Sequence, residues 1–349
     1  MLKHTTIGSG LFALALTLAF CSNGFAQSAP SYTVTKTVAL GAPDRWDYLT
    51  FDPSSHRVFV AHGDRVTVVD GRDGAIVGQV EGFPGGPHGV AIVPASGRGY
   101  SDDGKAGTAS SFDLATLKQI KTIKAAPDAD GILFDPVSKH IFVINGDSAS
   151  VTVINPATDT AITTISAGGG LEFAVLDDSG KLYVDGAEKH EIVRIDTKTN
   201  QVDAHWAMPN CTKPRGIAID TATHRLFSSC ANNVLVVIST DSGATVASLP
   251  IGSRTDAAAF DPRRKLVFSS NGDGTLSMIA EKGPNNFVAL ASIPTMLGAR
   301  TMTIDPDSGR LYLVGADYTI NAAADPADIR HRYVVTPGSA KLLFLDPTP

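Results

Sequence analysis

The stretch Ile141–Ile165, IFVINGDSASVTVINPATDTAITTI, contains short runs of β-branched residues separated by turns of Gly, Asp, Asn and Pro. Residues 141–144, 151–154 and 161–165 are three such runs, and a fourth precedes them at 131–134. β-Branched and aromatic residues favour strands, whereas Asn, Asp, Gly and Pro favour turns. The sequence therefore predicts four short strands in a unit of about forty residues.

The turn that opens this unit recurs along the whole chain. Each copy has an apolar residue, then Asp-Pro or a variant of it, then a polar turn and an apolar strand. The seven copies are centred on Asp52, Val93, Asp135, Asp177, Asp220, Asp261 and Asp305. Successive centres lie 41, 42, 42, 43, 41 and 44 residues apart. This is the spacing of β-propeller blades.

Seven such units predict an all-β, seven-bladed β-propeller that forms a single domain over residues 27–349. A four-stranded blade alone leaves an apolar face exposed, so blades are expected to stack around a ring. Residues 32–40 form an extra strand, and we expect it to close the ring as the outer strand of the last blade, next to 341–345. The expected blades are about 42–83, 84–126, 127–168, 169–210, 211–252, 253–294 and 295–349.

The repeat units resemble the YVTN-repeat, YncE-like family of secreted seven-bladed propellers. Ile141–Ile165 is the nearest copy, and LYVDGAEKHEIVRIDTKTNQV (Leu182–Val202) is a second. The resemblance covers nearly all of the chain after its first 26 residues. It implies blade geometry and a WD40-like ring, but because related propellers differ widely in activity it implies no particular reaction.

The first 26 residues have the pattern of a signal peptide. A basic start with Lys3 precedes an apolar run at 11–20, and Gly24-Phe25-Ala26 is a small-x-small cleavage signal. We therefore expect a periplasmic or secreted protein that begins near Gln27. The alternative is a lipid anchor on Cys21, although Phe20 is larger than the residue expected before a lipidated cysteine.

Charge and hydropathy exclude some classes of partner. The chain has a net charge of −6, and loss of residues 1–26 removes one Lys and no acid. Binding to nucleic acid requires a basic surface, so nucleic acid is an unexpected partner. No later stretch has the roughly 20 apolar residues of a membrane helix, and we expect no membrane insertion. The two remaining cysteines, Cys211 and Cys230, are expected to form a disulfide, or else to be two separately buried thiols.

The same position of every blade carries an ionisable residue. This polar ring stands five residues before each turn centre and consists of Asp47, His88, Asp130, Glu172, Arg215, Asp256 and Arg300. With charged residues at 18% of the chain, chance rarely fills an aligned column this way. We interpret the ring as a ligand-binding site at the mouth of the central channel, with Arg215 and Arg300 able to hold a carboxylate or phosphate. The alternative is a solvated channel lining.

Four of these residues come from consecutive blades and offer the ligands of a divalent metal: Asp47, His88, Asp130 and Glu172. Their spacing matches no known metal motif, so a metal is a possible cofactor and no cofactor is certain. Catalytic residues cannot be named, because the chain contains no nucleophile elbow, zinc-protease motif, P-loop or dinucleotide fingerprint.

Loops at the same end of the blades are expected to form a rim around the ring. The candidates are Trp46, His62, Asp103, Asn145, His190, Asn232 and Asn271. The last blade has a long insertion at 317–340, which is expected to act as a lid or else to be an exposed excursion. Its candidate site residues are Arg330, His331, Arg332 and Tyr333.

Three function classes remain open. The preferred hypothesis is an exported binding module that takes a small polar ligand, or another envelope protein, at the face with the ring and the insertion. An alternative is a lactonase-like or other metal-assisted hydrolase, in which His88 and the acidic residues position a metal or a water. A further alternative is a structural protein of the cell envelope. The sequence does not decide whether the chain is an enzyme.

Overall fold

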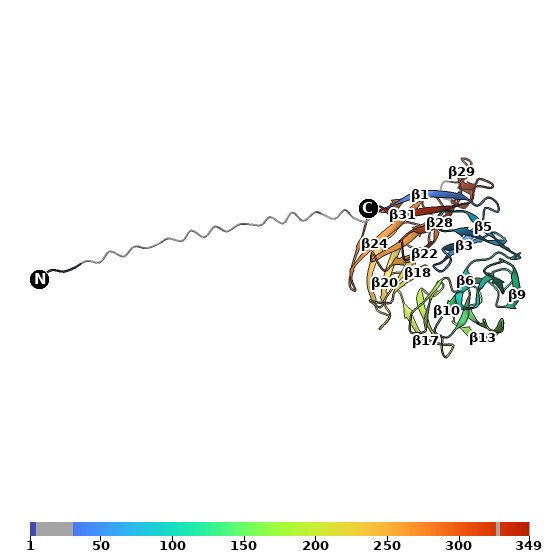
Figure 1. Cartoon of the computed structure of the whole chain (residues 1–349), viewed down its shortest axis with the longest axis horizontal. Coiled ribbons are helices and arrows are strands. Elements are labelled where there is room, and N and C mark those ends of the chain that lie inside the picture. The colour runs from blue at the N-terminus through green and yellow to red at the C-terminus, as the bar shows by residue number, and fades with distance from the viewer. Residues whose placement is uncertain (5–30, 326–328, 349) are drawn as a thin grey trace.

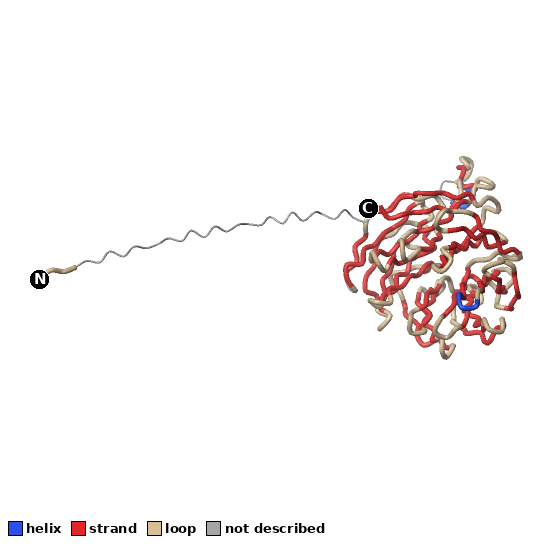
Figure 2. Tube along the Cα trace, in the orientation of Figure 1, coloured by secondary structure: helices blue, strands red, loops and turns tan. Residues whose placement is uncertain are grey.

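The computed structural model describes residues 1–4, 31–325 and 329–348, and its regular secondary structure consists almost entirely of strands. Seven twisted sheets are arranged around a central axis, as the ribbon and the tube both show (Figures 1 and 2). The all-β, seven-bladed propeller expected from the repeat is confirmed. The predicted signal peptide falls mainly on residues 5–30, which lie outside the described residues.

The first three blades each have four antiparallel strands in chain order. They are β2 (Trp46–Asp52), β3 (Arg57–His62), β4 (Arg65–Asp70) and β5 (Ile76–Glu81), then β6 (Val90–Val93), β7 (Arg98–Asp103), β8 (Thr108–Asp113) and β9 (Gln119–Lys124), then β10 (Ala129–Asp135), β11 (His140–Asn145), β12 (Ser150–Asn155) and β13 (Thr160–Ser166). A single 3₁₀ turn, η1 (Pro94–Ser96), follows β6 within the described chain.

The next three blades repeat this order. They are β14 (Ala174–Leu176), β15 (Lys181–Gly186), β16 (Glu191–Asp196) and β17 (Gln201–Ala207), then β18 (Pro214–Asp220), β19 (Arg225–Cys230), β20 (Val234–Ser239) and β21 (Thr245–Pro250), then β22 (Thr255–Asp261), β23 (Leu266–Asn271), β24 (Thr275–Gly283) and β25 (Asn286–Ala289). A short strand, β26 (Ile293–Pro294), also pairs with β24.

The seventh blade joins the two ends of the domain. It consists of β27 (Thr301–Ile304), β28 (Leu311–Gly315), β31 (Lys341–Thr348) and, outermost, β1 (Ser31–Ala39). Strand β1 pairs with β31 along its whole length, and the two lie side by side in the ribbon (Figure 1). The predicted closure by the N-terminal strand is confirmed, and β1 covers the edge of β31.

Apolar clusters fill the spaces between adjacent blades. Strand side chains alternate between the two faces of a sheet, so each blade can contribute to one cluster on either side. In the described residues there are seven such clusters, one for each pair of neighbouring blades. The cluster between the sixth and seventh blades includes Phe268, and the one between the seventh and first includes Tyr312, both buried. Stability is therefore distributed around the ring.

The recurring aspartate shapes the turn after the first strand of a blade. The carboxylate of Asp135 accepts hydrogen bonds from the backbone N–H groups of Val137 and Ser138, both at 2.9 Å. Asp261 makes the same contacts with Arg263 and Arg264. These bonds fix a tight turn that lets the second strand return antiparallel to the first.

The first strands of the seven blades contact one another in sequence around the axis, from β2 through β27 and back to β2. The residue at the start of each first strand is therefore carried to one end of the axis. Outside the blades, the insertion forms a hairpin of β29 (Tyr318–Ile320) and β30 (Tyr333–Val335) with a short helix, α1 (Ile329–Arg332), before β30. Among the described residues, no helix is long and apolar enough to cross a membrane.

Candidate functional site

A polar cavity of about 810 Å³ lies where the first strands begin. Six of the seven residues of the polar ring line it: Asp47, Asp130, Glu172, Arg215, Asp256 and Arg300. The rest of the wall includes Tyr48 of β2, Arg254 and Leu297 from loops of the sixth and seventh blades, and Tyr318 and Tyr333 from β29 and β30. The size is that of a small-molecule site.

A recurrent β-bulge helps to place the ring residues. The pairing of β10 with β11 skips Asp130, that of β18 with β19 skips Arg215, and that of β22 with β23 skips Asp256. Asp47 lies in a similar irregularity of β2. A bulged residue leaves the regular ladder and its side chain is re-aimed. Here the bulges accompany side chains that line the cavity at the strand starts.

His88 links the first three blades at the ring. Its Nδ1 atom is 3.0 Å from a carboxylate oxygen of Asp47 and 2.6 Å from one of Asp130. These are ion-pair distances, and neither contact has the angles of a hydrogen bond. Burial opposes a charged imidazole, but the two carboxylates outweigh the effect of burial and raise the pKa of His88 to about 11. Without another cation, His88 is therefore an imidazolium at neutral pH.

The other four ring residues form two ion pairs between neighbouring blades. Arg215 donates a hydrogen bond to Glu172, and the Nε of Arg300 lies 2.9 Å from Asp256. Burial raises the pKa of Glu172 to about 8, against the attraction of Arg215. Burial likewise raises the pKa of Asp256 to about 6, against Arg300. The ring is thus organised into a triad and two pairs.

An aromatic pair blocks the axis beneath the cavity. Tyr48 of the first blade and Phe173 of the fourth have ring centroids 4.3 Å apart. Tyr48 lines the polar cavity, whereas Phe173 lines a second, mainly apolar cavity of about 330 Å³ beside later residues of the first strands. The aromatic pair thus lies between the two cavities, and Tyr48 forms a floor of the polar one.

The hairpin of the insertion forms one wall of the polar cavity. Tyr318 and Tyr333 both line it, in the same cavity as Arg300. Gly298 lets Tyr318 approach, because a Cβ added there would lie 2.4 Å from the tyrosine hydroxyl. The side chain of Arg330, a predicted lid residue, lies outside the described residues. His331 is exposed and is not among the residues that line the cavity.

None of the predicted rim residues lines the cavity in the described chain, and of the insertion candidates Arg332 does not line it either. His62 is fully buried with its Nδ1 3.0 Å from the Thr67 hydroxyl, so it is a core residue. Trp46 packs against the cluster between the seventh and first blades. The others hold loops together through hydrogen bonds: Asp103, Asn145, His190, Asn232 and Asn271.

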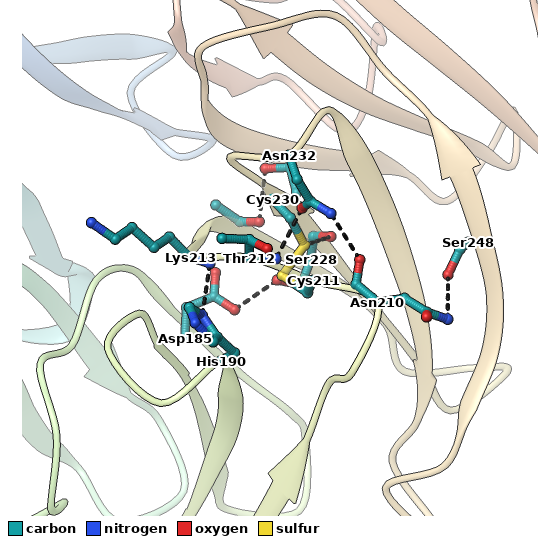
Figure 3. The surroundings of a disulfide bond; sticks show 12 residues. Asp185, His190, Asn210, Cys211, Thr212, Lys213, Ser228, Cys230, Asn232 and Ser248 are labelled. Carbon is teal, nitrogen blue, oxygen red and sulfur yellow. Dashed lines mark hydrogen bonds between the residues drawn. A yellow bond between two sulfur atoms is a disulfide. The ribbon is translucent and has the colours of Figure 1, made fainter.

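Cys211 and Cys230 form a disulfide at the start of the fifth blade (Figure 3). Both cysteines are buried. Around the bond, the N–H of Thr212 donates to Asn232 and the N–H of Lys213 donates to His190 (Figure 3). The disulfide thus fixes the loop that leads into Arg215 of the polar ring.

Two buried carboxyl groups lie behind the ring, on second strands. Asp102 accepts hydrogen bonds from the N–H groups of His88 and Gly89, and burial raises its pKa to about 7. Asp185 accepts one from the Ser228 hydroxyl at 2.8 Å, and burial raises its pKa to about 8. In the described part of the chain, each has one carboxylate oxygen without a hydrogen-bond partner. Neither residue lines the cavity.

Sequence reasoning missed Tyr48, Arg254 and Tyr318. Tyr48 carried a usable signal, because the column one residue after the polar ring is Gly89, Gly131, Gly216, Ala257 and Thr301 in the other blades, except for Phe173. The aromatic side chains of Tyr48 and Phe173 stand out in a column of otherwise small residues, and they mark the place where side chains fill the axis. Arg254 stands two residues before Asp256, in a column whose residues are too varied to mark a site: Arg45, Gly86, Asp128, Gly170, Lys213 and Gly298 in the other blades. Tyr318 begins β29 in the insertion, outside the repeat.

The fold and the cavity define the class of protein, which is a seven-bladed β-propeller with a polar cavity at one end of its axis. No protein-family model and no curated protein matches the chain. Among solved structures it is similar to the hydrazine synthase of Kuenenia stuttgartiensis, with a TM-score of 0.68 and 17% identity over 77% of this chain and 92% of that one. It is also similar to the RRP9 WD40 repeats, with a TM-score of 0.75 and 12% identity over 91% of this chain and 100% of that one.

A chain of the mitotic checkpoint complex is similar over 99% of both chains, with a TM-score of 0.73 and 14% identity. At these identities the likeness shows a shared propeller fold and nothing about activity.

Proposed function

We propose that this protein is an exported β-propeller binding module that takes a small polar ligand in the polar cavity. The observation that carries the proposal is the convergence of six charged ring residues from six blades on one cavity of about 810 Å³. A closed floor at Tyr48 and a tyrosine wall at Tyr318 and Tyr333 favour a site over a solvated passage. Concave sites with a few convergent polar groups are typical of ligand binding.

A thermal-shift screen tests this proposal. The probes are amino acids, short peptides, amines, organic acids, sugars, lactones and divalent metals, each added to the purified mature chain. A ligand of the cavity raises the melting temperature of the wild type and loses that effect in Asp130→Asn. Asp241→Asn, at an exposed site, is the matched control and keeps it. A ligand that raises the melting temperature equally in both variants binds elsewhere. If no probe raises the melting temperature of the wild type, the proposal of a small-ligand module is contradicted.

Export and family are part of the same proposal. The signal-peptide pattern of residues 1–26 and a disulfide between Cys211 and Cys230 both suit a periplasmic or secreted protein, since disulfides persist in oxidising compartments. The resemblance of the repeat to YVTN-repeat, YncE-like propellers supports the same location. Intact-mass measurement of the exported chain tests this, with a start near Gln27 expected and a retained N-terminus as the contrary result.

A metal-assisted hydrolase is the second candidate, because Asp47, His88 and Asp130 offer three ligand atoms that all lie within 4.8 Å of one another. This donor set suits a divalent cation. Glu172, the fourth predicted ligand, is outside this group and pairs with Arg215. Elemental analysis and assays of lactone and ester hydrolysis test this candidate. Stoichiometric metal and activity that are both lost in His88→Gln support the hydrolase, and their absence from the wild type refutes it.

A further inference from the structure

The carboxylates of the polar cavity have few partners within the protein. An ionised carboxylate offers about four acceptor sites. In the described residues, Asp47 and Asp130 contact only Nδ1 of His88, and Glu172 uses one oxygen, toward Arg215. The turn carboxylates differ, because both oxygens of Asp135 accept backbone hydrogen bonds. The cavity therefore presents unfilled acceptor sites to whatever enters it.

These acceptors are also sheltered from solvent. The side chains of Asp47, Asp130 and Glu172 are 24%, 21% and 16% exposed. Partly desolvated carboxylates with unfilled acceptor sites are unfavourable, and a ligand that supplies hydrogen-bond donors removes that penalty. A primary ammonium supplies three donors and a positive charge. On this side of the cavity three carboxyl groups, from the first, third and fourth blades, face two cations, His88 and Arg215, and the remaining acceptor sites fit an ammonium group.

The opposite charge lies on the sixth and seventh blades. Arg254 forms no ion pair among the described residues, and its guanidinium donates to the backbone carbonyl of Gly272. Arg300 contacts Asp256 through Nε, and among the described residues its two terminal nitrogens make no hydrogen bond. Terminal guanidinium nitrogens bind a carboxylate in a bidentate way. This side of the cavity therefore fits a carboxylate group.

From this separation of charge we propose that the ligand is a zwitterion of the short-peptide class, with a free ammonium and a free carboxylate at its two ends. The inference rests on the function proposed above and names the ligand of the same cavity. The ammonium lies on Asp47 and Asp130 and beside Glu172, whose raised pKa a bound cation lowers, and the carboxylate lies on Arg254 and Arg300. A cavity of about 810 Å³ holds a peptide of a few residues together with water.

Titration calorimetry with trialanine tests the ligand class. The matched probes are N-acetyl-trialanine, which lacks the ammonium, and trialanine amide, which lacks the carboxylate. Each blocked peptide is expected to bind at least about tenfold more weakly, because each loses hydrogen bonds between charged groups. Acetylated and amidated peptides that bind as well as the free one overturn the zwitterion and leave the binding module standing.

Variants test the placement of the two ends. Arg300→Gln should shrink the penalty for amidation, and Asp130→Asn should shrink the penalty for acetylation, each by several-fold. Arg254→Gln provides a second test at the carboxylate end. Arg263→Gln, which removes an exposed ion pair with Asp307, is the control and keeps both penalties. Unchanged penalties in all three cavity variants, with melting temperatures near that of the wild type, overturn the placement.

The failure of this inference and that of the proposed function are distinguishable. If sugars, organic acids or simple amines bind in the cavity and trialanine, mixed tripeptides and free amino acids do not, the zwitterion is wrong and the module is right. If no probe of any class binds, both are wrong.

Discussion

Asp185 is a carboxyl group buried from solvent, and its environment makes stability depend on pH. Burial raises its pKa to about 8, from about 3.9 in an unfolded chain. An acid whose pKa is higher in the folded state holds its proton more tightly there. The free energy of unfolding is therefore expected to fall as pH rises from about 4 to about 8, by up to about 1.4 kcal/mol per pH unit, and to level off above that range.

Asp185→Asn removes this titration. Its free energy of unfolding, measured by urea denaturation across the same pH range, should fall less steeply than that of the wild type and should exceed it at pH 8. Asp241→Asn, at an exposed site, is the control and should follow the wild type. Parallel curves for the wild type and Asp185→Asn would show that Asp185 does not titrate in this range.

At the residue scale, the sequence could predict positions but not pairings. The polar ring was visible as an aligned column, because the repeat fixes which residue starts each first strand. That His88 contacts both Asp47 and Asp130, while Glu172 turns to Arg215, depends on side-chain geometry that no column contains. The prediction of His62 as a rim residue was wrong for the same reason. Its position at the end of a strand is typical of a rim residue, but its side chain is buried in the core.

At the element scale, the hairpin of the insertion depends on one glycine. Gly298 has φ +77°, and a Cβ there would meet the Tyr318 hydroxyl. Gly338 has a similar φ of +73° with nothing within 4 Å of an added Cβ. Both Ala variants carry the backbone cost of about 1 kcal/mol, and Gly298→Ala should also displace Tyr318. We expect a lower melting temperature and weaker ligand binding in Gly298→Ala than in Gly338→Ala. Equal melting temperatures and equal ligand affinities in the two variants would show that Tyr318 does not contribute to ligand binding.

The disulfide between Cys211 and Cys230 should make a measurable contribution to the free energy of unfolding. It closes a loop over a sequence separation of 19 residues, and such a loop contributes about 3 kcal/mol in the chain-entropy account. Cys211→Ala combined with Cys230→Ala should therefore lower the free energy of unfolding by about 2–4 kcal/mol, as measured by urea denaturation. Reduction of the wild type should have a similar effect. A loss near zero for both would show that the surrounding loop contacts suffice.

The architecture of the whole molecule was the most predictable feature, because each blade repeats the same pattern. Seven copies of the turn around Asp135 and its equivalents constrain the strand order. The extra strand before the first copy can complete only the last blade, which lacks a fourth strand of its own. The insertion was less predictable. Its hairpin of β29 and β30 lies outside the repeat, so only its length marked it as special. The blocked axis was also hidden, since it depends on a contact between the first and fourth blades.

Closure of the ring gives the last prediction. Tyr32 of β1 is 3% exposed and makes an edge-to-face contact with Phe268 of the sixth blade, with ring centroids 5.1 Å apart. The strand that completes the seventh blade thus also packs on its neighbour. Tyr32→Ala should lower the free energy of unfolding by about 3–5 kcal/mol, as buried aromatic truncations do.

Thr33→Ala, at an exposed position of the same strand, is the control and should change the free energy of unfolding by less than about 0.5 kcal/mol. Because every blade is stabilised through its neighbours, the loss in Tyr32→Ala should appear as a shift of one cooperative transition. Separate melting of the seventh blade, seen by hydrogen exchange as early loss of protection confined to β1 and β31, would instead show that the ring tolerates an open seam.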